Sequence, residues 1–430
     1  MKYRILSNLI SWIFPTKTDR VHFKTWCRML DFRKNVPAIK RNYQNVIKNI
    51  KNKEGKIKVL FLVNENSKWK TQSLYDLMSA SDKFEPVVAI TIADFQRNFS
   101  KEEKAETIDE NYEFFKLKGL NCVIAYDAKK DRAIDLKEFN PQIVFYQQPW
   151  GINKLQRPKY VSKFALTCYV PYFVQNYGDV EIDCCQELHQ SLFRYYILNK
   201  DWEDMYAPEF AQAAGEIKGL GHTMLDEFYL KRDYQPSKNY VIYAPHHSIN
   251  NFENYSTFLK NGKQILEYAK SHPEINWVFK PHPTLKYKLK QTGFMSEADI
   301  ENYYKEWAEI STYCNNGNYA ELFLESKALI TDCASFLVEY FCTKKPVIHL
   351  ISSTCGIVPK APFKKIIDTY YKARNLDEMY EHFENVLIKE DDILKEKRLK
   401  VLKESGLLDN YAAKNILHDI ETFLEGSCNE

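Results

Sequence analysis

The stretch Ala328–Leu350, ALITDCASFLVEYFCTKKPVIHL, decides the fold of this chain. Its pattern predicts a strand, a tight turn, a helix and a second strand. The short apolar run Ala328–Thr331 is typical of a buried parallel strand, and Val338 and Tyr340 give the following helix an inward face. The second strand is expected at Val347–Leu350. A strand followed by a crossover helix and another strand is the repeating unit of a parallel α/β sheet.

The turn of this unit carries the first candidate site. Asp332 stands where it can cap the helix, and Ala334 and Ser335 begin its first turn. Backbone N–H groups without an intrahelical partner meet a hydroxyl there, and such a helix start binds anions. We therefore expect Asp332, Ala334 and Ser335 to form an anion site at an edge where open α/β sheets bind nucleotides, with Glu339 one helical turn later placed for ribose hydroxyls. An ordinary capped helix after a strand has the same local pattern.

Composition bounds the class of protein. The chain has 430 residues, of which 45% are hydrophobic and 27% charged, as in a folded protein of two or three domains. Lys plus Arg number 60 and Asp plus Glu 57, so a net charge of +3 argues against nucleic acid as a partner. The 10 cysteines contain no CxxC pair, which favours neither a zinc cluster nor a disulfide framework and fits a reducing cytoplasm.

Residues 1–55 form a basic, amphipathic N-terminal segment. Ile5, Leu6, Leu9, Ile10, Trp12, Ile13 and Phe14 form a nearly continuous apolar surface, flanked by Lys2, Arg4, Lys17 and Arg20. The run is too short to span a bilayer and has no cleavage site of a secretory signal. Aromatic residues with basic flanks suit the inner face of the cytoplasmic membrane. A helix that docks on its own protein has the same pattern, so both interpretations stay open. From Arg33 to Lys58, a solvated helical face is expected.

Residues 56–230 are predicted to form a Rossmann-like domain. Strands are expected at 57–63, 86–91, 121–126 and 142–147, with helices at 69–80, 102–118 and 132–139. This alternation implies right-handed crossovers and a parallel sheet. The sheet is expected to end before Gln147–Val174, which reads as irregular and rich in aromatic residues. No GxGxxG occurs, so a dinucleotide is not indicated.

Residues 235–390 are predicted to form the second Rossmann-like domain. Its strand Val241–Ala244 leads into His246, His247 and Ser248, and its strand Asn276–Phe279 leads into Lys280 and His282. Pro281 and Pro283 flank His282 and hold it on a stiff loop. Adjacent histidines are expected to point in different directions, so we predict no metal site and no metal cofactor.

Three stretches that follow one another along the chain in the family's order, and a short link before them, resemble a known family. The segment ITDCASFLVEYFCTKKPVIHL resembles the ITDYSS-type segment of the CDP-glycerol:glycerophosphate glycerophosphotransferases, the teichoic-acid polymerase family. Val241–Ile249, VIYAPHHSI, is similar to the family's strand-then-APT segment, and Trp277–Thr284, WVFKPHPT, carries its KPHP motif. Gly219–Asp226, GLGHTMLD, resembles the GxP-x-x-D link before the second domain. The resemblance covers roughly the C-terminal half.

The chain departs from the family at two places. Between Gln147 and Val174 it lacks the family's histidine-glycine motif, whose histidine is a candidate base, and the next histidine is His189 in a helical context. Ser248 stands where an arginine is common in the family. The general base is therefore left unassigned, and a lost diphosphate contact needs compensation from a histidine or from Lys280.

The resemblance implies a GT-B architecture, in which two Rossmann-like domains face a cleft. Residues 56–230 would form the domain on the acceptor side, and residues 235–390 the domain on the nucleotide-donor side. Residues 391–430 are then expected to form a C-terminal helix packing across the domains. The implied reaction moves a polyol phosphate from a CDP-activated donor to a hydroxyl of a cell-surface polysaccharide or lipid-linked glycan and releases CMP. His282, with His246 or His247, would act on the reacting phosphate, and Lys280, Ser248, Asp332, Ala334, Ser335 and Glu339 would bind the donor.

Two other interpretations fit the same sequence. One is an inverting GT-B glycosyltransferase that uses a nucleotide sugar in capsule or lipopolysaccharide synthesis, because the same diphosphate site serves both reactions. The other is a non-catalytic scaffold of the same fold, which the missing histidine-glycine motif favours.

Overall fold

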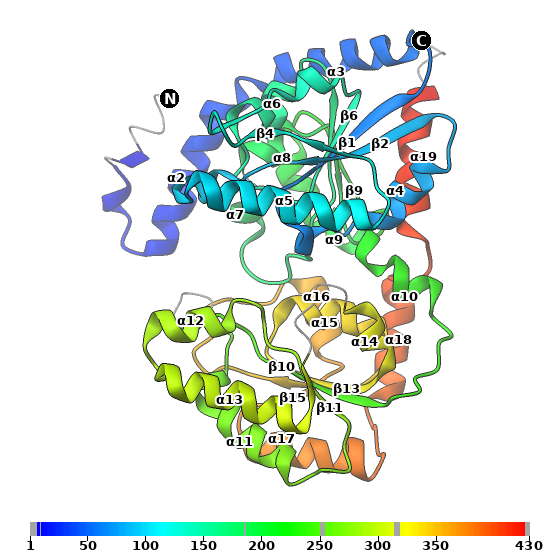
Figure 1. The fold of residues 1–430 in the computed structure, drawn as a ribbon. Coiled ribbons are helices and arrows are strands. Elements are labelled where there is room, and N and C mark those ends of the chain that lie inside the picture. Colours follow the sequence, from blue (N-terminus) through cyan, green and yellow to red (C-terminus); the bar gives the residue numbers. More distant parts are fainter. Residues whose placement is uncertain (1–6, 9, 185, 250–253, 314–318, 426–430) are drawn as a thin grey trace. The chain divides into compact units, whose positions relative to one another are not determined.

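The computed structural model describes residues 7–8, 10–184, 186–249, 254–313 and 319–425. The chain divides into two compact units, each built on its own parallel sheet (Figure 1). Unit 1 comprises Met1–Val174, Asp179–Asp226 and Asn410–Glu430, and unit 2 comprises Gln175–Gly178 and Glu227–Asp409.

Unit 1 contains a seven-stranded sheet in the order β3-β2-β1-β6-β7-β8-β9, and all its strand pairs are parallel. Its strands are β1 (Ile57–Val63), β2 (Phe84–Ile90), β3 (Cys122–Ile124), β6 (Ile143–Tyr146), β7 (Leu166–Tyr169), β8 (Arg194–Tyr196) and β9 (Glu216–Lys218). A short antiparallel hairpin, β4 (Tyr126–Asp127) and β5 (Arg132–Ala133), follows β3. The expected helix at 132–139 is therefore wrong in its first part, and only the 3₁₀ turn Leu136–Phe139 forms.

The sequence suggested that the sheet of unit 1 ends before Gln147, and this expectation is wrong. Strand β7 lies inside the stretch expected to be irregular, and every residue of it is buried. Two further strands, β8 and β9, continue the sheet beyond it. The strand pattern was hidden because β7 has polar as well as apolar residues, yet Thr167 has no exposed surface and its hydroxyl bonds that of Tyr43.

Helices of unit 1 pack their apolar stripes on this sheet. They are α2 (Lys17–Arg33), α3 (Val36–Lys51), α4 (Gln72–Ser79), α5 (Lys101–Leu117), α6 (Pro158–Val161), α7 (Val180–Cys184), α8 (Glu187–Ser191), α9 (Lys200–Phe210) and α19 (Ala412–Glu425). The solvated face expected from Arg33 to Lys58 forms, with Lys40, Arg41 and Lys48 exposed. The opposite face of α3 packs in the unit's core and consists of Val36, Ile39, Tyr43, Val46 and Ile50. The three- and four-residue spacing of these side chains makes one continuous stripe.

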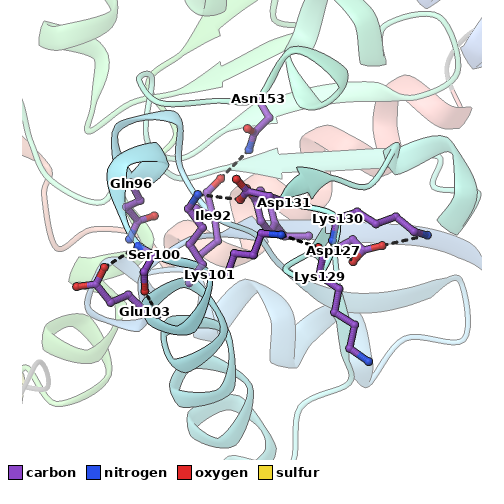
Figure 2. Close-up of polar contacts among 12 residues, drawn as sticks. Ile92, Gln96, Ser100, Lys101, Glu103, Asp127, Lys129, Lys130, Asp131 and Asn153 are labelled. Carbon is purple, nitrogen blue, oxygen red and sulfur yellow. Dashed lines mark hydrogen bonds and ion pairs between the residues drawn. The ribbon is translucent and has the colours of Figure 1, made fainter.

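Helix α5 begins where side chains satisfy its first amides, as Figure 2 shows. The Ser100 hydroxyl accepts a hydrogen bond from the Glu103 N–H, and the Glu103 carboxylate accepts one from the Ser100 N–H. Nearby, Lys101 donates to the carbonyl of Lys129 beside the β4–β5 hairpin. This reciprocal cap fixes where the helix after β2 starts.

Unit 2 contains a six-stranded parallel sheet in the order β12-β11-β10-β13-β14-β15. Its strands are β10 (Tyr240–Ala244), β11 (Trp277–Phe279), β12 (Thr312–Tyr313), β13 (Ser326–Thr331), β14 (Val347–Leu350) and β15 (Tyr371–Ala373). Its helices include α11 (Phe258–Lys270), α12 (Leu285–Thr292), α13 (Glu297–Ile310), α14 (Ala320–Glu325), α15 (Ala334–Phe341), α16 (Ala361–Ile367), α17 (Leu376–Phe383) and α18 (Lys395–Ser405). Each unit thus has the parallel α/β architecture that the sequence predicted.

The C-terminal segment 391–430 contains two helices, where the sequence suggested one. Helix α18 belongs to unit 2 and α19 to unit 1. In unit 1, the buried carboxylate of Asp226 accepts hydrogen bonds from the N–H groups of Ala412 and Ala413 and so holds the start of α19. In unit 2, Arg398 is fully buried and donates to the Lys344 carbonyl and to Asp392.

The N-terminal segment is described only in part, because Ile5, Leu6 and Leu9 of the predicted apolar surface lie outside the described residues. Of its other members, Trp12 and Ile13 in the 3₁₀ turn Ser11–Ile13 are 76% and 77% exposed. The Arg20 guanidinium lies 5.0 Å from the centroid of the Trp12 ring. No helix among the described residues is both long and apolar enough to cross a membrane.

Candidate active site

The candidate site residues of unit 2 gather at the carboxyl ends of three adjacent strands. Strand β10 lies between β11 and β13, so the segments after these strands leave the sheet side by side. The β10–β11 pairing continues past the strand ends, since the Lys280 N–H bonds the Tyr243 carbonyl at 2.9 Å and the His282 N–H bonds the Pro245 carbonyl at 3.0 Å. This edge is where open α/β sheets bind ligands.

Three histidines form a cluster at this edge. The ring centroids of His246 and His247 are 4.3 Å apart, those of His247 and His282 are 3.9 Å apart, and those of His246 and His282 are 5.2 Å apart. One ring nitrogen of each histidine lies within 4.8 Å of those of the other two. The expectation that adjacent histidines point apart is therefore wrong here, because residues 245–249 after β10 no longer form a strand, in which side chains alternate between the two faces.

The ring of His246 is fixed by Ser248. Its Nδ1 lies 3.2 Å from the Ser248 backbone nitrogen and 2.8 Å from the Ser248 hydroxyl oxygen. A backbone N–H can only donate, so Nδ1 accepts, and the neutral ring carries its proton on Nε2. Ser248 is fully buried, and its hydroxyl oxygen also accepts from the Tyr255 N–H at 2.9 Å.

The ring of His282 is fixed in the same way by Thr284. Its Nδ1 lies 3.2 Å from the Thr284 backbone nitrogen and 3.0 Å from the Thr284 hydroxyl oxygen. The neutral His282 ring therefore also carries its proton on Nε2. The backbone of His282 is held at both ends, since its N–H bonds Pro245 and its carbonyl accepts from the Leu285 N–H at the start of α12.

All three histidines are kept neutral. Burial lowers the pKa of His282 to about 3, with smaller contributions from His247 and Lys280. Burial, reinforced by Lys288, lowers the pKa of His247 to about 4. The pKa of His246 lies well below its usual value because of burial and of its two histidine neighbours. At neutral pH the cluster therefore offers uncharged imidazoles and not imidazolium ions.

The expectation that Asp332 caps α15 is wrong. Cys333 is the N-cap residue, and the Asp332 carboxylate turns back toward the segment after β10. It accepts hydrogen bonds from the N–H groups of His246 and Thr257, both at 2.6 Å, and from the Thr257 hydroxyl at 2.9 Å. Burial raises the pKa of Asp332 to about 6 despite these bonds. Asp332 thus positions the backbone that carries His246.

The start of α15 faces the same strand ends. The Ser335 hydroxyl lies 3.3 Å from the Cys333 sulfur, and burial raises the pKa of the Cys333 thiol to about 11, so that the thiol stays neutral. The Ala334 carbonyl accepts a hydrogen bond from the Asn176 side chain at 2.9 Å. Ala334 and Ser335 are partly exposed, as the predicted diphosphate contact requires, and that contact stays a prediction.

Lys280 and Glu339 lie deeper than expected for residues that bind the donor. Each is 3% exposed. The Lys280 ammonium lies 5.4 Å from the Tyr319 ring centroid and 5.8 Å from that of Phe336, and Glu339 accepts a hydrogen bond from the Tyr319 hydroxyl. From this buried position beside two aromatic rings, the Lys280 ammonium can stabilise an anion through its electrostatic potential without touching it. The roles of Lys280 on phosphate and of Glu339 on ribose stay predictions.

A metal ion does not fit the histidine cluster. Nδ1 of His246 and of His282 each accepts from a backbone N–H, so the free nitrogen of both rings carries a proton and is a donor. Metal binding at Nε2 would move the ring proton to Nδ1, where it would point at the hydrogen of a backbone N–H.

A second group of possible metal ligands lies in unit 1 and consists of His22, Asp179 and Glu181. The His22 Nε2 lies 3.2 Å from the Asp179 carboxylate, and its Nδ1 lies 3.0 Å from the Glu181 carboxylate.

A cavity of about 340 Å³ lies in unit 2 beside this edge. It is lined by loop residues after β10, β14 and β15, including Ser256, Thr257, Ser352, Thr354 and Arg374. Five hydroxyl side chains, the Arg374 guanidinium and the Lys260 ammonium line this wall together with apolar side chains. These polar groups suit a polyol or sugar with a negative charge.

Sequence reasoning missed two residues of the site, Thr284 and Thr257. The sequence contained a pattern that could have identified Thr284, because His282-Pro283-Thr284 repeats the spacing of His246-His247-Ser248 at the end of the neighbouring strand. Thr257 carried no such signal, since its contact with Asp332 joins positions 75 residues apart.

Comparisons with known proteins agree with this geometry. Residues 224–352 match the family described as CDP-Glycerol:Poly(glycerophosphate) glycerophosphotransferase. This range contains the three histidines and the start of α15. No curated protein matches the chain.

Solved structures match over most of the chain. The wall teichoic acid polymerase TagF superposes with a TM-score of 0.55 at 11% identity, over 94% of this chain and 99% of that one, and a variant of it gives 0.57 at 12% identity with the same coverage. UDP-GlcNAc 2-epimerase from Neisseria meningitidis, bound to UDP-GlcNAc, gives a TM-score of 0.55 at 13% identity, over 85% of this chain and 100% of that one.

A putative UDP-N-acetylglucosamine 2-epimerase from Listeria monocytogenes gives a TM-score of 0.56 at 16% identity, over 86% of this chain and 98% of that one. At these identities the matches establish the fold, and they confirm the predicted pair of Rossmann-like units of the GT-B class. The family match falls in residues 224–352, most of which belong to unit 2. Over this segment the chain is similar to the CDP-glycerol:poly(glycerophosphate) glycerophosphotransferase family, and the match supports a transferase of that type.

Proposed function

We propose that the protein transfers a polyol phosphate from a CDP-activated donor to a hydroxyl of a cell-surface polysaccharide or lipid-linked glycan. The observation that carries the proposal is the convergence of His246, His282 and the start of α15 at one sheet edge, within the segment that matches the family. The acceptor oxygen forms a bond to the donor's β-phosphorus. The bond from that phosphorus to the bridging oxygen breaks, and CMP leaves with that oxygen and its electron pair.

The residues of this edge have separate roles in the proposal. Ser335 and the amides at the start of α15 bind one phosphate of the diphosphate, with the helix dipole favouring its charge. His282 donates to the transferring group and stabilises the charge that develops on it. Lys280 contributes positive potential from its buried position. A base must take the acceptor proton, and none of the neutral histidines with low pKa is assigned to that role.

The reaction is proposed to need no metal cofactor. A diphosphate usually needs cations, and here a helix start, neutral imidazole donors and Lys280 supply donors and positive charge in a site of low dielectric. The protonated Nε2 atoms of His246 and His282 support this part of the proposal, since they are donors and not metal ligands.

The test is a panel of activated donors in the presence of a chelator. CDP-glycerol and CDP-ribitol should release CMP in the presence of a glycan acceptor, whereas UDP and GDP sugars should not react. Product release from a nucleotide sugar instead would assign the protein to the glycosyltransferases. Turnover that requires an added divalent ion would contradict the metal-free mechanism.

The protein is also proposed to bind the inner face of the cytoplasmic membrane through its N-terminal segment. Exposed Trp12, Ile13 and Trp26, the last 51% exposed, support this proposal because aromatic and apolar side chains beside basic residues favour an anionic interface. Trp12→Ala combined with Ile13→Ala should weaken sedimentation with phosphatidylglycerol vesicles, and salt should weaken it further. Equal sedimentation of both proteins would refute the assignment of this surface.

A further inference from the structure

The same three-residue turn occurs twice at the sheet edge of unit 2. His246-His247-Ser248 follows β10, and His282-Pro283-Thr284 follows β11. In both turns the histidine Nδ1 faces the backbone N–H of the residue two positions later, at 3.2 Å, and the hydroxyl of that residue, at 2.8 Å in the first and 3.0 Å in the second. We call this arrangement the His-x-Ser/Thr turn.

This turn fixes the protonation of the ring. A proton on Nδ1 would point at a backbone N–H, so both the Nδ1–H tautomer and the imidazolium ion are disfavoured. The neutral ring with its proton on Nε2 remains. Only the hydroxyl of Ser248 or Thr284 can rotate, and it donates to Nδ1 and so strengthens the same state.

In both turns the Nε2–H group of the histidine can donate a hydrogen bond to a ligand. Within the described part of the chain, Nε2 of His246 and of His282 makes no hydrogen bond, and neither atom is fully buried. His247 lacks this arrangement: its buried Nδ1 has no partner among the described residues, and its ring lies against that of His282. His247 therefore supports the His282 ring by packing.

We propose that His246 and His282 form a pair of neutral Nε2–H donors, locked by Ser248 and Thr284, that binds the oxygens of one phosphate group of the diphosphate. This inference deepens the proposed function and rests on it for the identity of the ligand. It assigns His246 to ligand binding, and it makes Ser248 and Thr284 positioning residues.

A pair of neutral donors has a consequence for selectivity. Imidazolium would attract any anion, including the monophosphate product, through its charge. Neutral donors select an oxygen atom by the geometry of the hydrogen bond. They also leave no additional buried charge in the site when no ligand is bound. Lys280 and Lys288, the charged groups that lower the pKa values of His282 and His247, supply the positive potential from a distance.

The first test measures the tautomers directly. Long-range proton–nitrogen NMR of the full chain labelled with ¹⁵N-histidine should show Nε2–H and an unprotonated Nδ1 for His246 and His282 from pH 5 to 8. Signals are assigned by their loss in His246→Gln and His282→Gln. His272 is the internal reference for the opposite state, since its Nδ1 lies 2.9 Å from the Tyr268 carbonyl, which can only accept. An Nδ1–H or doubly protonated ring at either site would overturn the proposal.

The second test replaces each donor by amides of two lengths. The glutamine amide reaches the place of Nε2, and the asparagine amide reaches only that of Nδ1. With CDP as the probe in calorimetry, His246→Gln and His282→Gln should lose about tenfold or less in affinity. His246→Asn and His282→Asn should lose as much affinity as His246→Leu and His282→Leu, which have no hydrogen-bond donor in the side chain. His272→Gln should bind CDP like the wild type.

Two outcomes separate this inference from the proposed function. Addition of methylenediphosphonate should shift the Nε2 signals of both histidines even if the protein transfers none of the donors in the panel. Unchanged Nε2 signals at saturating diphosphonate would overturn the donor pair while leaving polyol phosphate transfer intact. Equal affinities of the glutamine and asparagine variants for CDP would also overturn it.

Discussion

His222 in unit 1 and His282 in unit 2 have the same local hydrogen bond and different surroundings. Nδ1 of His222 accepts from the N–H of Met224, two residues later, at 3.3 Å, just as Nδ1 of His282 accepts from Thr284. Burial lowers the pKa of both histidines to about 3. His222, however, is 2% exposed, and its buried Nε2 is turned toward the backbone of Pro171.

The comparison shows that a locked tautomer does not by itself make a binding site. In unit 1 the Nε2 proton is directed into the protein, and the ring joins two segments of the fold. In unit 2 the same proton reaches the surface at the end of a strand, beside a second histidine in the same state. The position of the turn at the carboxyl edge of the sheet makes the difference.

The largest expected effect separates activity from stability. His282→Leu should lower turnover about a hundredfold or more, because it removes a donor to developing charge, and it should change the unfolding free energy little. His222→Leu should lower the unfolding free energy by about 1–3 kcal/mol, since the Met224 N–H loses its acceptor inside the protein. Turnover is measured per folded molecule, and stability by urea unfolding.

Two results would contradict the expected difference between the His282→Leu and His222→Leu variants. Near-normal turnover of His282→Leu would make His282 a structural residue like His222. A large loss of turnover in folded His222→Leu would place that histidine at the reaction centre and would remove the contrast between the two units.

Two buried aspartates extend the comparison. Asp332 and Asp226 are each 2% exposed, burial raises the pKa of each to about 6, and each accepts from two backbone N–H groups and one hydroxyl. An asparagine in either place would direct its NH₂ group at a backbone N–H or hydroxyl donor, and that hydrogen bond would be lost. Asp332→Asn and Asp226→Asn should therefore both destabilise the protein.

Only the change in unit 2 should affect the donor. Asp332 holds the N–H of His246, so Asp332→Asn should weaken CDP binding about tenfold, while Asp226→Asn should leave it unchanged at a temperature where both are folded. Equal CDP affinities, measured by calorimetry, would show that the His246 backbone does not need this carboxylate.

The pH dependence should also differ between binding and stability. His282 and His222 are neutral in the folded state down to about pH 3, while in the unfolded chain they take up protons below about pH 6.5. Their contribution to stability is complete above pH 6.5 and is lost as the pH falls toward 3. Asp332 and Asp226 act in the opposite direction, because the folded state takes up their protons from about pH 6 downward.

Urea unfolding at pH 8, 6.5 and 5 should therefore show falling stability, and His222→Leu should flatten the fall. Affinity for CDP-glycerol, a diester without a titration in this range, should stay level from pH 8 to 6.5 and fall below about pH 6, where Asp332 takes up its proton. A rise in affinity as the pH falls through 6.5 would mean that an imidazolium binds the donor.

The smallest effects are expected for the two positioning hydroxyls. Ser248→Ala and Thr284→Val keep the backbone N–H, so the tautomer stays fixed and only the ring orientation loosens. Each should raise KM for the donor severalfold with little change in kcat, and the NMR tautomer signals should persist. A loss in kcat as large as that of His282→Leu would assign the hydroxyl itself to the reaction.

Much of this protein follows from its sequence alone. Apolar runs such as Val241–Ala244 and Trp277–Phe279 form the expected parallel strands, and the residues after them fall at one edge because parallel strands all end on the same side. The positions of His246, His282 and Ser335 at this edge therefore needed no tertiary information. Local patterns also fix the ring tautomers, since each turn is closed within three residues.

Only the tertiary structure decided where side chains from distant segments meet. Asp332 has the sequence of a helix cap, yet its carboxylate bonds Thr257 and His246, which lie 75 and 86 residues away. Strand β7 formed where the sequence indicated a loop, and α3 has a buried face in addition to the solvated face that the sequence indicated. Burial also separates His222 from His282, whose own turns are alike. Nothing in a local sequence records which atoms of the rest of the chain will cover it, and that cover sets both the hydrogen-bond partners and the exposure of each group.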